Sequence, residues 1–264
     1  MPSPIVLGAQ QTGAGRPLVL VHGFPFDAEQ WSEQLTTLAE RRRVIAVDLR
    51  GRGRSTHAPN DDWTLDTHAD DVARTLDDLG LARADVVGLS MGGYVAFALL
   101  RRHPGKVASL TLIDSKASAD TAEARHGRDE NARIVREHGT RALVPIMIPK
   151  LVAPSSPAWV SQKLAVMIER TPPATCIRDL MAMRDRPDSD PTSVRVPTLV
   201  LHGALDALMP VAAAHAMAAA IPGARFVEVP GSGHIACLEN APVVNQALAS
   251  FLRELDGTAR EESP

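Results

Sequence analysis

Gly88-Leu89-Ser90-Met91-Gly92-Gly93 is the stretch of sequence that decides the fold. The short apolar run at residues 86–88 predicts a buried strand, and the Ala-rich residues 91–102 predict a helix. The pattern G-x-S-x-G is weak on its own, but a serine on a tight turn between a strand and a helix needs neighbours that have almost no side chain. The two flanking glycines meet this need. We therefore predict that Ser90 is a nucleophile raised above the end of a strand, at the N-terminus of a helix.

A nucleophilic serine needs two partners, which the sequence should also supply. A serine hydroxyl is a weak nucleophile at neutral pH, so it requires a general base within hydrogen-bond reach and a carboxylate that orients this base. In open, mostly parallel sheets such groups gather beyond the carboxyl ends of the strands. Asp206 follows the apolar run at residues 198–201, and His234 follows the run at residues 226–229. We therefore expect Ser90, His234 and Asp206 to form a catalytic triad.

Asp114 is the alternative acid, because it also follows an apolar run, at residues 110–113, and is within reach of the same imidazole if the strands are neighbours. We favour Asp206 because Gly203 and Pro210 around it are typical of a loop that presents a carboxylate. Among the eight other histidines, His22 and His202 precede glycines at strand ends and are expected to orient loops. The remaining six fall on expected loops or helical faces: His57, His68, His103, His126, His138 and His215.

Acyl transfer by a serine also needs hydrogen-bond donors aimed at the oxyanion of the tetrahedral intermediate. In this arrangement the donors are the backbone N–H of the residue after the nucleophile and an N–H of an early loop. The two residues are Met91 and Phe24, and the latter lies in His22-Gly23-Phe24-Pro25, directly after the apolar run at residues 18–21. We therefore expect the N–H groups of Phe24 and Met91 to form an oxyanion hole.

The rest of the chain alternates short apolar runs of strand length with longer helical patterns. This order is typical of a mostly parallel sheet with helices on both faces, and runs that are nearly continuous in Val, Leu and Ile are typical of strands buried on both faces. Further expected strands are residues 44–47 and, more weakly, 5–7. The expected helices are residues 29–41, 65–79, 91–102, 211–220 and 242–255.

The alternation stops once, between residues 115 and 191. Here helical stretches at residues 121–137 and 160–169 are punctuated by prolines, and no strand pattern appears. We expect a helical cap at 115–191 inserted into a core of residues 1–114 and 192–256, with residues 257–264 as a flexible tail. The cap is rich in apolar side chains, and Met147, Trp159 and Met183 are candidates for lining a substrate pocket. For any one of them, burial of the cap's own apolar face is the favoured explanation.

Composition and charge exclude several classes of function. With 264 residues, 45% of them hydrophobic and 22% charged, the chain has the size and content of one soluble globular unit. The net charge of −3, with basic residues dispersed among acids, argues against a nucleic acid partner or an anionic membrane surface. The short basic clusters at residues 41–43 and at Arg50, Arg52 and Arg54 are expected on the surface.

Localisation and cofactors follow from what the sequence lacks. Cys176 and Cys237 lie far apart, which predicts neither a zinc site nor a disulfide and fits a reducing cytoplasm. We expect no membrane span, no metal and no cofactor, because no long apolar run and no P-loop, HExxH or EF-hand pattern occurs. Residues 231–236 fit G-x-G-x-x-A, but no βαβ unit follows them. The expected partner is a small-molecule ester or lactone, and the oligomeric state stays open.

These segments together resemble the α/β-hydrolase family over nearly the whole chain, from residue 5 to residue 252. The matching segments are His22-Gly23-Phe24-Pro25 followed by Trp31, Asp48-Leu49-Arg50-Gly51-Arg52-Gly53-Arg54-Ser55, residues 88–93, Gly203 with Asp206 and Pro210, and Gly233-His234 with Glu239 and Pro242. The chain order Ser, Asp, His is also that of this family rather than of chymotrypsin or subtilisin. The resemblance implies an α/β fold, a mostly parallel sheet with helices on both faces and an inserted helical cap.

The resemblance is less specific for the substrate. Similar family members include carboxylesterases, enol-lactonases, cofactor-free perhydrolases and carbon–carbon bond hydrolases. Ser90 disfavours the epoxide hydrolases and haloalkane dehalogenases of the family, which carry Asp at this position. Residues 183–188, Met-Arg-Asp-Arg-Pro-Asp, are similar to the end of the cap in small bacterial esterases.

The expected activity is therefore that of a carboxylesterase-type serine hydrolase. It would cleave carboxylic esters of small to medium, mostly apolar substrates through an acyl-enzyme. The main alternative is an enol-lactonase or a carbon–carbon bond hydrolase that uses the same triad. A perhydrolase, or a ligand sensor with very slow turnover, is a further alternative.

Overall fold

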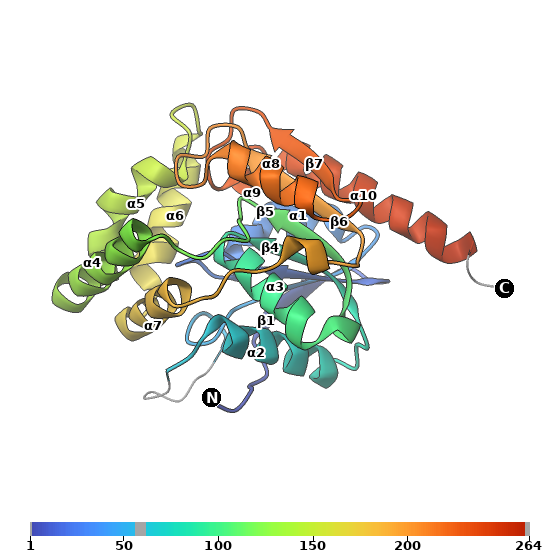
Figure 1. The fold of residues 1–264 in the computed structure, drawn as a ribbon, viewed down its shortest axis with the longest axis horizontal. Coiled ribbons are helices and arrows are strands. Elements are labelled where there is room, and N and C mark those ends of the chain that lie inside the picture. Colours follow the sequence, from blue (N-terminus) through green and yellow to red (C-terminus); the bar gives the residue numbers. More distant parts are fainter. Residues whose placement is uncertain (1, 56–61, 262–264) are drawn as a thin grey trace.

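A seven-stranded sheet forms the centre of the molecule in the computed structural model, which describes residues 2–55 and 62–261 (Figure 1). The strand order is β1-β3-β2-β4-β5-β6-β7; β1 pairs antiparallel with β3, and the other neighbours pair in parallel. The strands are β1 (Ala9–Thr12), β2 (Pro17–Val21), β3 (Arg43–Val47), β4 (Ala84–Leu89), β5 (Val107–Ile113), β6 (Thr198–Gly203) and β7 (Arg225–Val229). The predicted fold class, a mostly parallel α/β sheet, is confirmed.

The expected strands are found within a few residues of their predicted ends, with one exception. Every residue of β4, β5 and β6 is buried, which agrees with their continuous apolar sequences. The weak prediction of a strand at residues 5–7 is wrong, because the first strand begins only at Ala9. The backbone N–H groups of Ile5 and Leu7 donate instead to the side chains of Asp71 and Thr75 on the first long helix.

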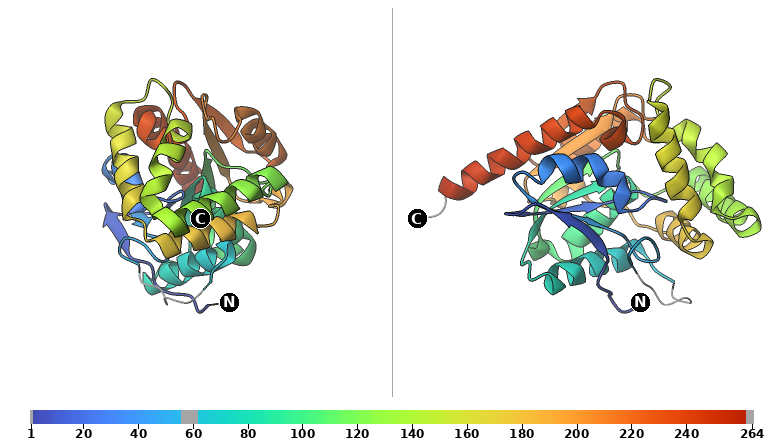
Figure 2. Two further views of the ribbon diagram at one scale, coloured as in Figure 1. Left: turned by 90° about the vertical axis from the view of Figure 1, so that its left-hand side faces the viewer. Right: turned by 180° about the vertical axis from the view of Figure 1, so that it is seen from behind.

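Helices pack on both faces of the sheet. On one face α2 lies beside α3, and on the other α1 lies beside α10, as the views in Figures 1 and 2 show. The helices of the core are α1 (Ser32–Leu38), α2 (Leu65–Asp78), α3 (Met91–Arg102), α8 (Val211–Ala220), α9 (Ala236–Glu239) and α10 (Ala241–Glu261), with short 3-10 helices η1 (Ala28–Trp31), η2 (Pro104–Lys106) and η4 (Pro191–Ser193). The predicted helix at residues 29–41 is thus divided into η1 and a shorter α1.

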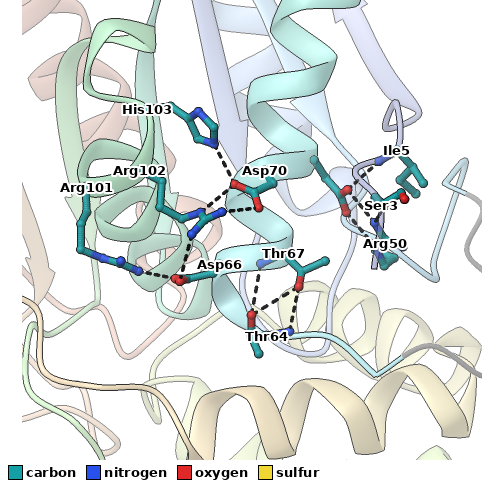
Figure 3. Close-up of polar contacts among 11 residues, drawn as sticks. Ser3, Ile5, Arg50, Thr64, Asp66, Thr67, Asp70, Arg101, Arg102 and His103 are labelled. Carbon is teal, nitrogen blue, oxygen red and sulfur yellow. Dashed lines mark hydrogen bonds and ion pairs between the residues drawn. The ribbon is translucent and has the colours of Figure 1, made fainter. Parts of the chain in front are cut away.

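Ion pairs connect α3 to α2. The helix α3 begins directly after Ser90. Arg102 forms a bidentate contact with Asp70 at 2.7 Å for both nitrogens, and His103 Nε2 lies 2.7 Å from the same carboxylate (Figure 3). Arg101 pairs with Asp66 one turn away. Because these contacts cross between two helices, they fix the helix that presents the predicted nucleophile.

Four helices occupy the segment between β5 and β6 and stand at one end of the sheet, on the left in Figure 1. They are α4 (Ala122–His138), α5 (Val144–Leu151), α6 (Ala158–Arg170) and α7 (Pro173–Arg184), with the 3-10 helix η3 (Thr140–Leu143). The two helices expected from the sequence correspond to α4 and α6. The helices α5 and α7 were not predicted, because α5 contains Pro149 and both helices carry a proline in their first turn. Proline is compatible with the first turn of a helix, where its missing N–H has no intrahelical partner.

The C-terminal helix is longer than the sequence suggests. We expected a helix to residue 255 and a flexible tail from residue 257, but α10 continues to Glu261, and residues 262–264 lie outside the described residues. A single glycine within a helix costs only about 1 kcal/mol relative to alanine, so Gly257 does not end α10. Residues 257–261 therefore belong to α10 and not to a tail.

The prediction that the arginine clusters lie on the surface is wrong for three residues. Arg42, Arg50 and Arg52 are each 3% exposed or less, and each pairs with a buried carboxylate, of Asp85, Asp71 and Asp179 respectively. Arg50 forms a bidentate contact with Asp71. It also donates to the carbonyl of Ser3 at 2.8 Å (Figure 3). The partners lie far away in the sequence, so the local charge pattern does not reveal them.

Nothing in residues 2–55 and 62–261 amounts to a helix long and apolar enough to cross a membrane.

Candidate active site

Ser90 sits on the tight turn that the glycine pattern predicts. Its backbone has φ 52° and ψ −113°, in the left-handed region that side chains disfavour. A Cβ on Gly88 would come within 2.2 Å of the carbonyl oxygen of Gly92, and a Cβ on Gly92 would come within 2.1 Å of the carbonyl oxygen of Val21. Both glycines are therefore required for the turn to close and for α3 to pack against the end of β2.

The structure brings the three predicted triad residues together from the ends of β4, β6 and β7. The Nε2 atom of His234 lies 2.9 Å from the Oγ atom of Ser90, and its Nδ1 atom lies 2.7 Å from Oδ2 of Asp206. With Nδ1–H donating to the carboxylate, Nε2 is free to accept the serine proton. The arrangement thus has the connectivity that a general base and its orienting carboxylate require.

Asp206 is held in the ionised form that this role needs. Its other oxygen, Oδ1, accepts hydrogen bonds from the N–H groups of Leu208 at 2.8 Å and Met209 at 3.0 Å. Burial opposes ionisation, but the charge and hydrogen bond of His234 together with these two amides outweigh it and hold the pKa of Asp206 below its ordinary value. The carboxylate is therefore charged at neutral pH and able to stabilise an imidazolium.

Asp114, the alternative acid, has a different position. Its Oδ1 accepts from the N–H of Gly203 at 2.7 Å, and its Oδ2 accepts from the N–H of Ala236 at 3.1 Å. Burial and the nearby charge of Asp206 raise its pKa well above the ordinary value. Asp114 therefore joins the loop that carries Asp206 to the loop that carries His234, whereas Asp206 contacts the imidazole itself.

One group of side chains near the triad has the chemical character of metal ligands. Polar atoms of Asp114, His202 and Asp206 lie within 4.8 Å of one another. Each side chain already makes hydrogen bonds, since His202 Nε2 donates to the carbonyl of Met209 at 2.7 Å, Asp114 accepts from two amides and Asp206 holds His234. As expected from the sequence, His202 orients a loop, here the one that presents Asp206.

The loop after β2 is held beside the nucleophile by buried polar contacts. The N–H of Gly23 donates to Gln30 at 2.9 Å, and a Cβ on Gly23 would come within 3.0 Å of Leu89, the residue before Ser90. His22 Nδ1 lies 2.9 Å from the carbonyl of Gly23, and His22 Nε2 accepts from the N–H of Leu49 at 3.0 Å. Burial and the charge of Arg52 lower the pKa of His22 to about 3, so this histidine is neutral and fixed in one tautomer.

The predicted oxyanion-hole residues lie in the two segments that meet where Gly23 contacts Leu89. Phe24 follows Gly23 in the loop, and Met91 is the first residue of α3. Within residues 2–55 and 62–261, neither N–H takes part in the backbone hydrogen bonds of loops and turns. An oxyanion hole formed by these two N–H groups stays a prediction.

The three pocket candidates of the cap occupy different environments. Met183 on α7 is 1% exposed, Trp159 on α6 is 43% exposed, and Met147 on α5 is half-buried against the apolar core. Two cavities of about 530 and 570 Å³ open beside α2, α3 and α7, and neither is lined by these residues or by the triad. The burial of Met183 favours a packing role, and substrate contact by Met147 and Trp159 stays a prediction.

Several side chains that shape the site were not identified from the sequence as its members. Asp179 on α7 accepts hydrogen bonds from Trp63 at 2.8 Å and from His68 at 2.9 Å and pairs with Arg52, while Arg52 donates to the carbonyl of Phe26 at 3.0 Å. His68, which we expected on a loop or a helical face, is thus part of a buried polar cluster. No short motif reveals these contacts, because they join the cap to the core. His57, also set aside, lies outside the described residues.

Known proteins are similar to this chain in both sequence and architecture. Residues 16–142 match a family model described as alpha/beta hydrolase fold, and residues 169–263 match one described as TAP-like protein. The chain is 30% identical to the AB hydrolase superfamily protein YisY of Bacillus subtilis, over 94% of this chain and 95% of that protein.

Solved structures of α/β hydrolases are also similar to this chain. A thermophilic esterase from Thermogutta terrifontis superposes with a TM-score of 0.91 at 38% identity, over 94% of this chain and 93% of that one. The enol-lactonase from Burkholderia xenovorans LB400 superposes with a TM-score of 0.84 at 27% identity, over 94% and 96%. The chain therefore belongs to the α/β-hydrolase family and is a hydrolase.

Proposed function

We propose that this hydrolase cleaves carboxylic esters of small to medium, mostly apolar substrates through an acyl-enzyme. The observation that carries the proposal is the continuous hydrogen-bonded chain from Ser90 through His234 to Asp206, with contacts of 2.9 and 2.7 Å. Such a chain activates a hydroxyl for attack on a carbonyl carbon and has little use in a protein that only binds ligands.

The first half of the reaction forms the acyl-enzyme. His234 Nε2 removes the proton of Ser90 as its Oγ atom adds to the carbonyl carbon, and the electron pair of the C=O bond moves to the oxygen. The N–H groups of Phe24 and Met91 stabilise this oxyanion. When the carbonyl re-forms, the bond to the alcohol oxygen breaks, and His234 gives its proton to the departing alcohol.

Hydrolysis of the acyl-enzyme completes the cycle. His234 takes a proton from water as the water oxygen adds to the acyl carbon, the second tetrahedral intermediate collapses, and Ser90 regains its proton as the carboxylic acid leaves. Asp206 remains ionised throughout and balances the positive charge of the imidazolium in each half of the reaction.

Support for the substrate class comes from the cap and from the relatives. The cap presents apolar side chains in number, which suits a mostly uncharged acyl or alcohol group. One structural neighbour is an esterase and another an enol-lactonase, and a lactone is an internal ester that the same steps would open. We propose that the partner is a small-molecule ester or lactone and that the protein binds neither nucleic acid nor a membrane. We also propose that it is located in the reducing cytoplasm, with which the free, buried Cys176 and Cys237 agree.

The test is hydrolysis of p-nitrophenyl esters of increasing acyl length by the wild type, Ser90→Ala and Ser118→Ala. Ser118 is exposed, so Ser118→Ala is the matched control. We expect activity on short or medium chains, loss of nearly all activity in Ser90→Ala alone, and a mass increase of one acyl group on the wild type in rapid-quench samples. An active Ser90→Ala enzyme would exclude the proposed nucleophile.

A second outcome separates the alternatives. If the folded wild type cleaves no ester, enol-lactone and dienone substrates decide between a lactonase and a carbon–carbon bond hydrolase, and a peroxyacid assay tests for a perhydrolase. Tight ligand binding without turnover would favour a sensor.

A further inference from the structure

The carboxylate of Glu239 holds both residues that flank His234. Glu239 is the last residue of α9, five positions after the histidine. Its Oε2 accepts from the N–H of Gly233 and its Oε1 accepts from the N–H of Ile235, each at 3.0 Å. The backbone on both sides of the catalytic imidazole is therefore fixed by one side chain.

The same carboxylate also holds the cap. Oε2 of Glu239 accepts from the N–H of Ala153 at 2.7 Å and from the hydroxyl of Ser156, both in the segment between α5 and α6. Four donors thus point at one carboxylate, two from the histidine loop and two from the cap. An ionised carboxylate has the acceptor capacity for all four, and hydrogen bonds to a charged acceptor are stronger than neutral ones.

Two further contacts place the cap directly on the histidine loop. The N–H of His234 itself donates to the carbonyl of Leu151, the last residue of α5, at 2.9 Å. A Cβ on Gly233 would lie 2.7 Å from the nitrogen of Ala153 and 2.9 Å from the carbonyl carbon of Val152. The backbone of the cap therefore packs against the histidine loop at a distance that only glycine permits.

We propose that Glu239 is a positioning residue through which the docked cap fixes the imidazole of His234. The inference rests on the proposed serine hydrolase chemistry. When the cap segment at residues 151–156 leaves, Glu239 loses two of its four donors and His234 loses its contact with Leu151, so the ring moves relative to Ser90. A misplacement of about 1 Å in such a site costs about 100-fold in rate.

The cap also contacts the loop that follows β2. At the end of α6, the Oγ1 atom of Thr171 donates to the carbonyl of Pro25 at 2.6 Å, and Arg170 contacts Asp27 through two nitrogens at 2.6 Å each. Pro25 and Asp27 belong to the loop that carries the Phe24 donor. The cap thus contacts both the loop of the general base and the loop of the expected oxyanion hole.

The experiment compares Glu239→Gln, Ser156→Ala and the double variant with the wild type. Glu239→Gln replaces one acceptor oxygen by an NH2 group, so at least one amide loses its partner, while Ser156→Ala removes a single donor of the cap. Exposed Glu40, in the turn after α1, gives the control Glu40→Gln. Three quantities are measured: kcat and KM for p-nitrophenyl butyrate, and the rate at which a fluorophosphonate labels Ser90.

We expect Glu239→Gln to lower kcat and the labelling rate about 10-fold or more with KM within about 2-fold, because ring placement affects the transition state rather than substrate binding. Ser156→Ala should lower kcat less. The double variant should be no slower than Glu239→Gln, since Ser156 contacts the histidine loop through the carboxylate that Glu239→Gln no longer has. Glu40→Gln should match the wild type.

Gly233→Ala tests the same inference without removing the carboxylate. The added methyl group would push the cap off the histidine loop, so kcat should fall as in Glu239→Gln, whereas Gly105→Ala, where a Cβ meets open space, should not change it. Unchanged kcat and labelling rates in a less stable Glu239→Gln, or losses that multiply in the double variant, would overturn the inference. Failure of the wild type to cleave esters would instead refute the proposed substrate class, and the labelling rates would still decide the role of Glu239.

Discussion

Ser90 combines a reactive side chain with an unfavourable backbone. Its φ of 52° lies in the left-handed region, where a side chain costs about 1–3 kcal/mol that the surrounding structure must offset. The turn persists because Gly88, Gly92 and the N–H of Ser90, which donates to Ile113 at 2.9 Å, fix it from three sides. The conformation that presents the nucleophile therefore lowers the stability of the fold.

Ser90→Gly should be more stable than Ser90→Ala, although both are inactive. Glycine adopts this conformation without steric cost, whereas alanine keeps the Cβ that causes the strain. We expect a difference of about 1 kcal/mol in the free energy of unfolding, after the greater entropy of the unfolded glycine variant is counted. Urea unfolding followed by circular dichroism measures it; a Ser90→Gly variant that is less stable than Ser90→Ala by the entropy cost of glycine, about 0.5–1 kcal/mol, would show that Ser90 carries no strain.

The two carboxylates beside His234 should differ in their effect on rate. Asp206→Asn removes the acceptor that sets the tautomer of the imidazole, and kcat should fall about 10⁴-fold. Asp114→Asn keeps one acceptor for the amides of Gly203 and Ala236 and leaves the imidazole contact intact, so its loss should stay below about 100-fold. Steady-state kinetics on a p-nitrophenyl ester compare the two, and a loss in Asp114→Asn as large as in Asp206→Asn would make Asp114 the acid.

The sequence predicted the three side chains that meet at the candidate active site better than it predicted the residues around them. Ser90, Asp206 and His234 each follow a recognisable strand, so chain order and fold class suffice to bring them together. Asp179 contacts Arg52, Trp63 and His68, which lie 127, 116 and 111 residues away in the sequence. No local pattern connects residues at such separations, and their pairing depends on how the cap packs.

Around Asp179, the contact between α7 and the core is a buried cluster of polar side chains rather than apolar packing. Asp179 is fully buried and is held by Arg52, by the indole N–H of Trp63 and by His68. Thr175, one turn earlier on the same helix, donates to the carbonyl of Gly51 at 2.8 Å. Such a contact tolerates little displacement, because a buried arginine without its carboxylate is costly.

Asp179→Ala should therefore destabilise the protein by about 3–5 kcal/mol, the usual effect of removing one partner of a buried ion pair. Asp185→Ala, one turn and a half further along at the end of α7, is the control; its side chain is 59% exposed, so the change should stay within about 0.5 kcal/mol. Thermal unfolding of both variants measures the difference. A loss below about 1 kcal/mol for Asp179→Ala would mean that the cap is held mainly by apolar packing.

Among the strands and helices, the sequence predicted those whose pattern of apolar residues is set by burial alone. The strands β4 to β6 are buried on both faces, and their apolar runs reveal them. The strand β1 has a partly exposed, mixed sequence, Ala9-Gln10-Gln11-Thr12, which gives no strand signal. In α5 the prolines obscured a helix whose apolar face contacts the rest of the cap and the core.

Buried histidines make the stability of the whole molecule depend on pH. Burial, reinforced by the charge of Arg52, lowers the pKa of His22 to about 3 and that of His68 well below its ordinary value of 6.5. Below pH 6.5 the unfolded chain therefore binds protons at these positions that the folded protein does not bind. The stability that they contribute is complete above pH 6.5 and is lost as the pH falls toward about 3.

We expect the free energy of unfolding to fall between about pH 6.5 and pH 5 by about 1 kcal/mol per pH unit for each buried histidine. Urea titrations at several pH values measure this slope. His68→Gln should reduce it by the share of one histidine, whereas His138→Gln, at an exposed position, should leave it unchanged. A stability that does not vary over this range would show that both rings are protonated in the folded state.

The place of the cap between β5 and β6 also has a consequence for the order in which the chain folds. The strands β2 to β5 and the helices α1 to α3 lie in one continuous part of the sequence, so the Ser90 turn can form as that part leaves the ribosome. Pairing of β6 with β5 must wait for the whole cap, although closing so long a loop adds only about 0.6 kcal/mol for each doubling of its length. Asp206 and His234 arrive last, which means that a nascent chain carries its serine for some time before it has the base to use it.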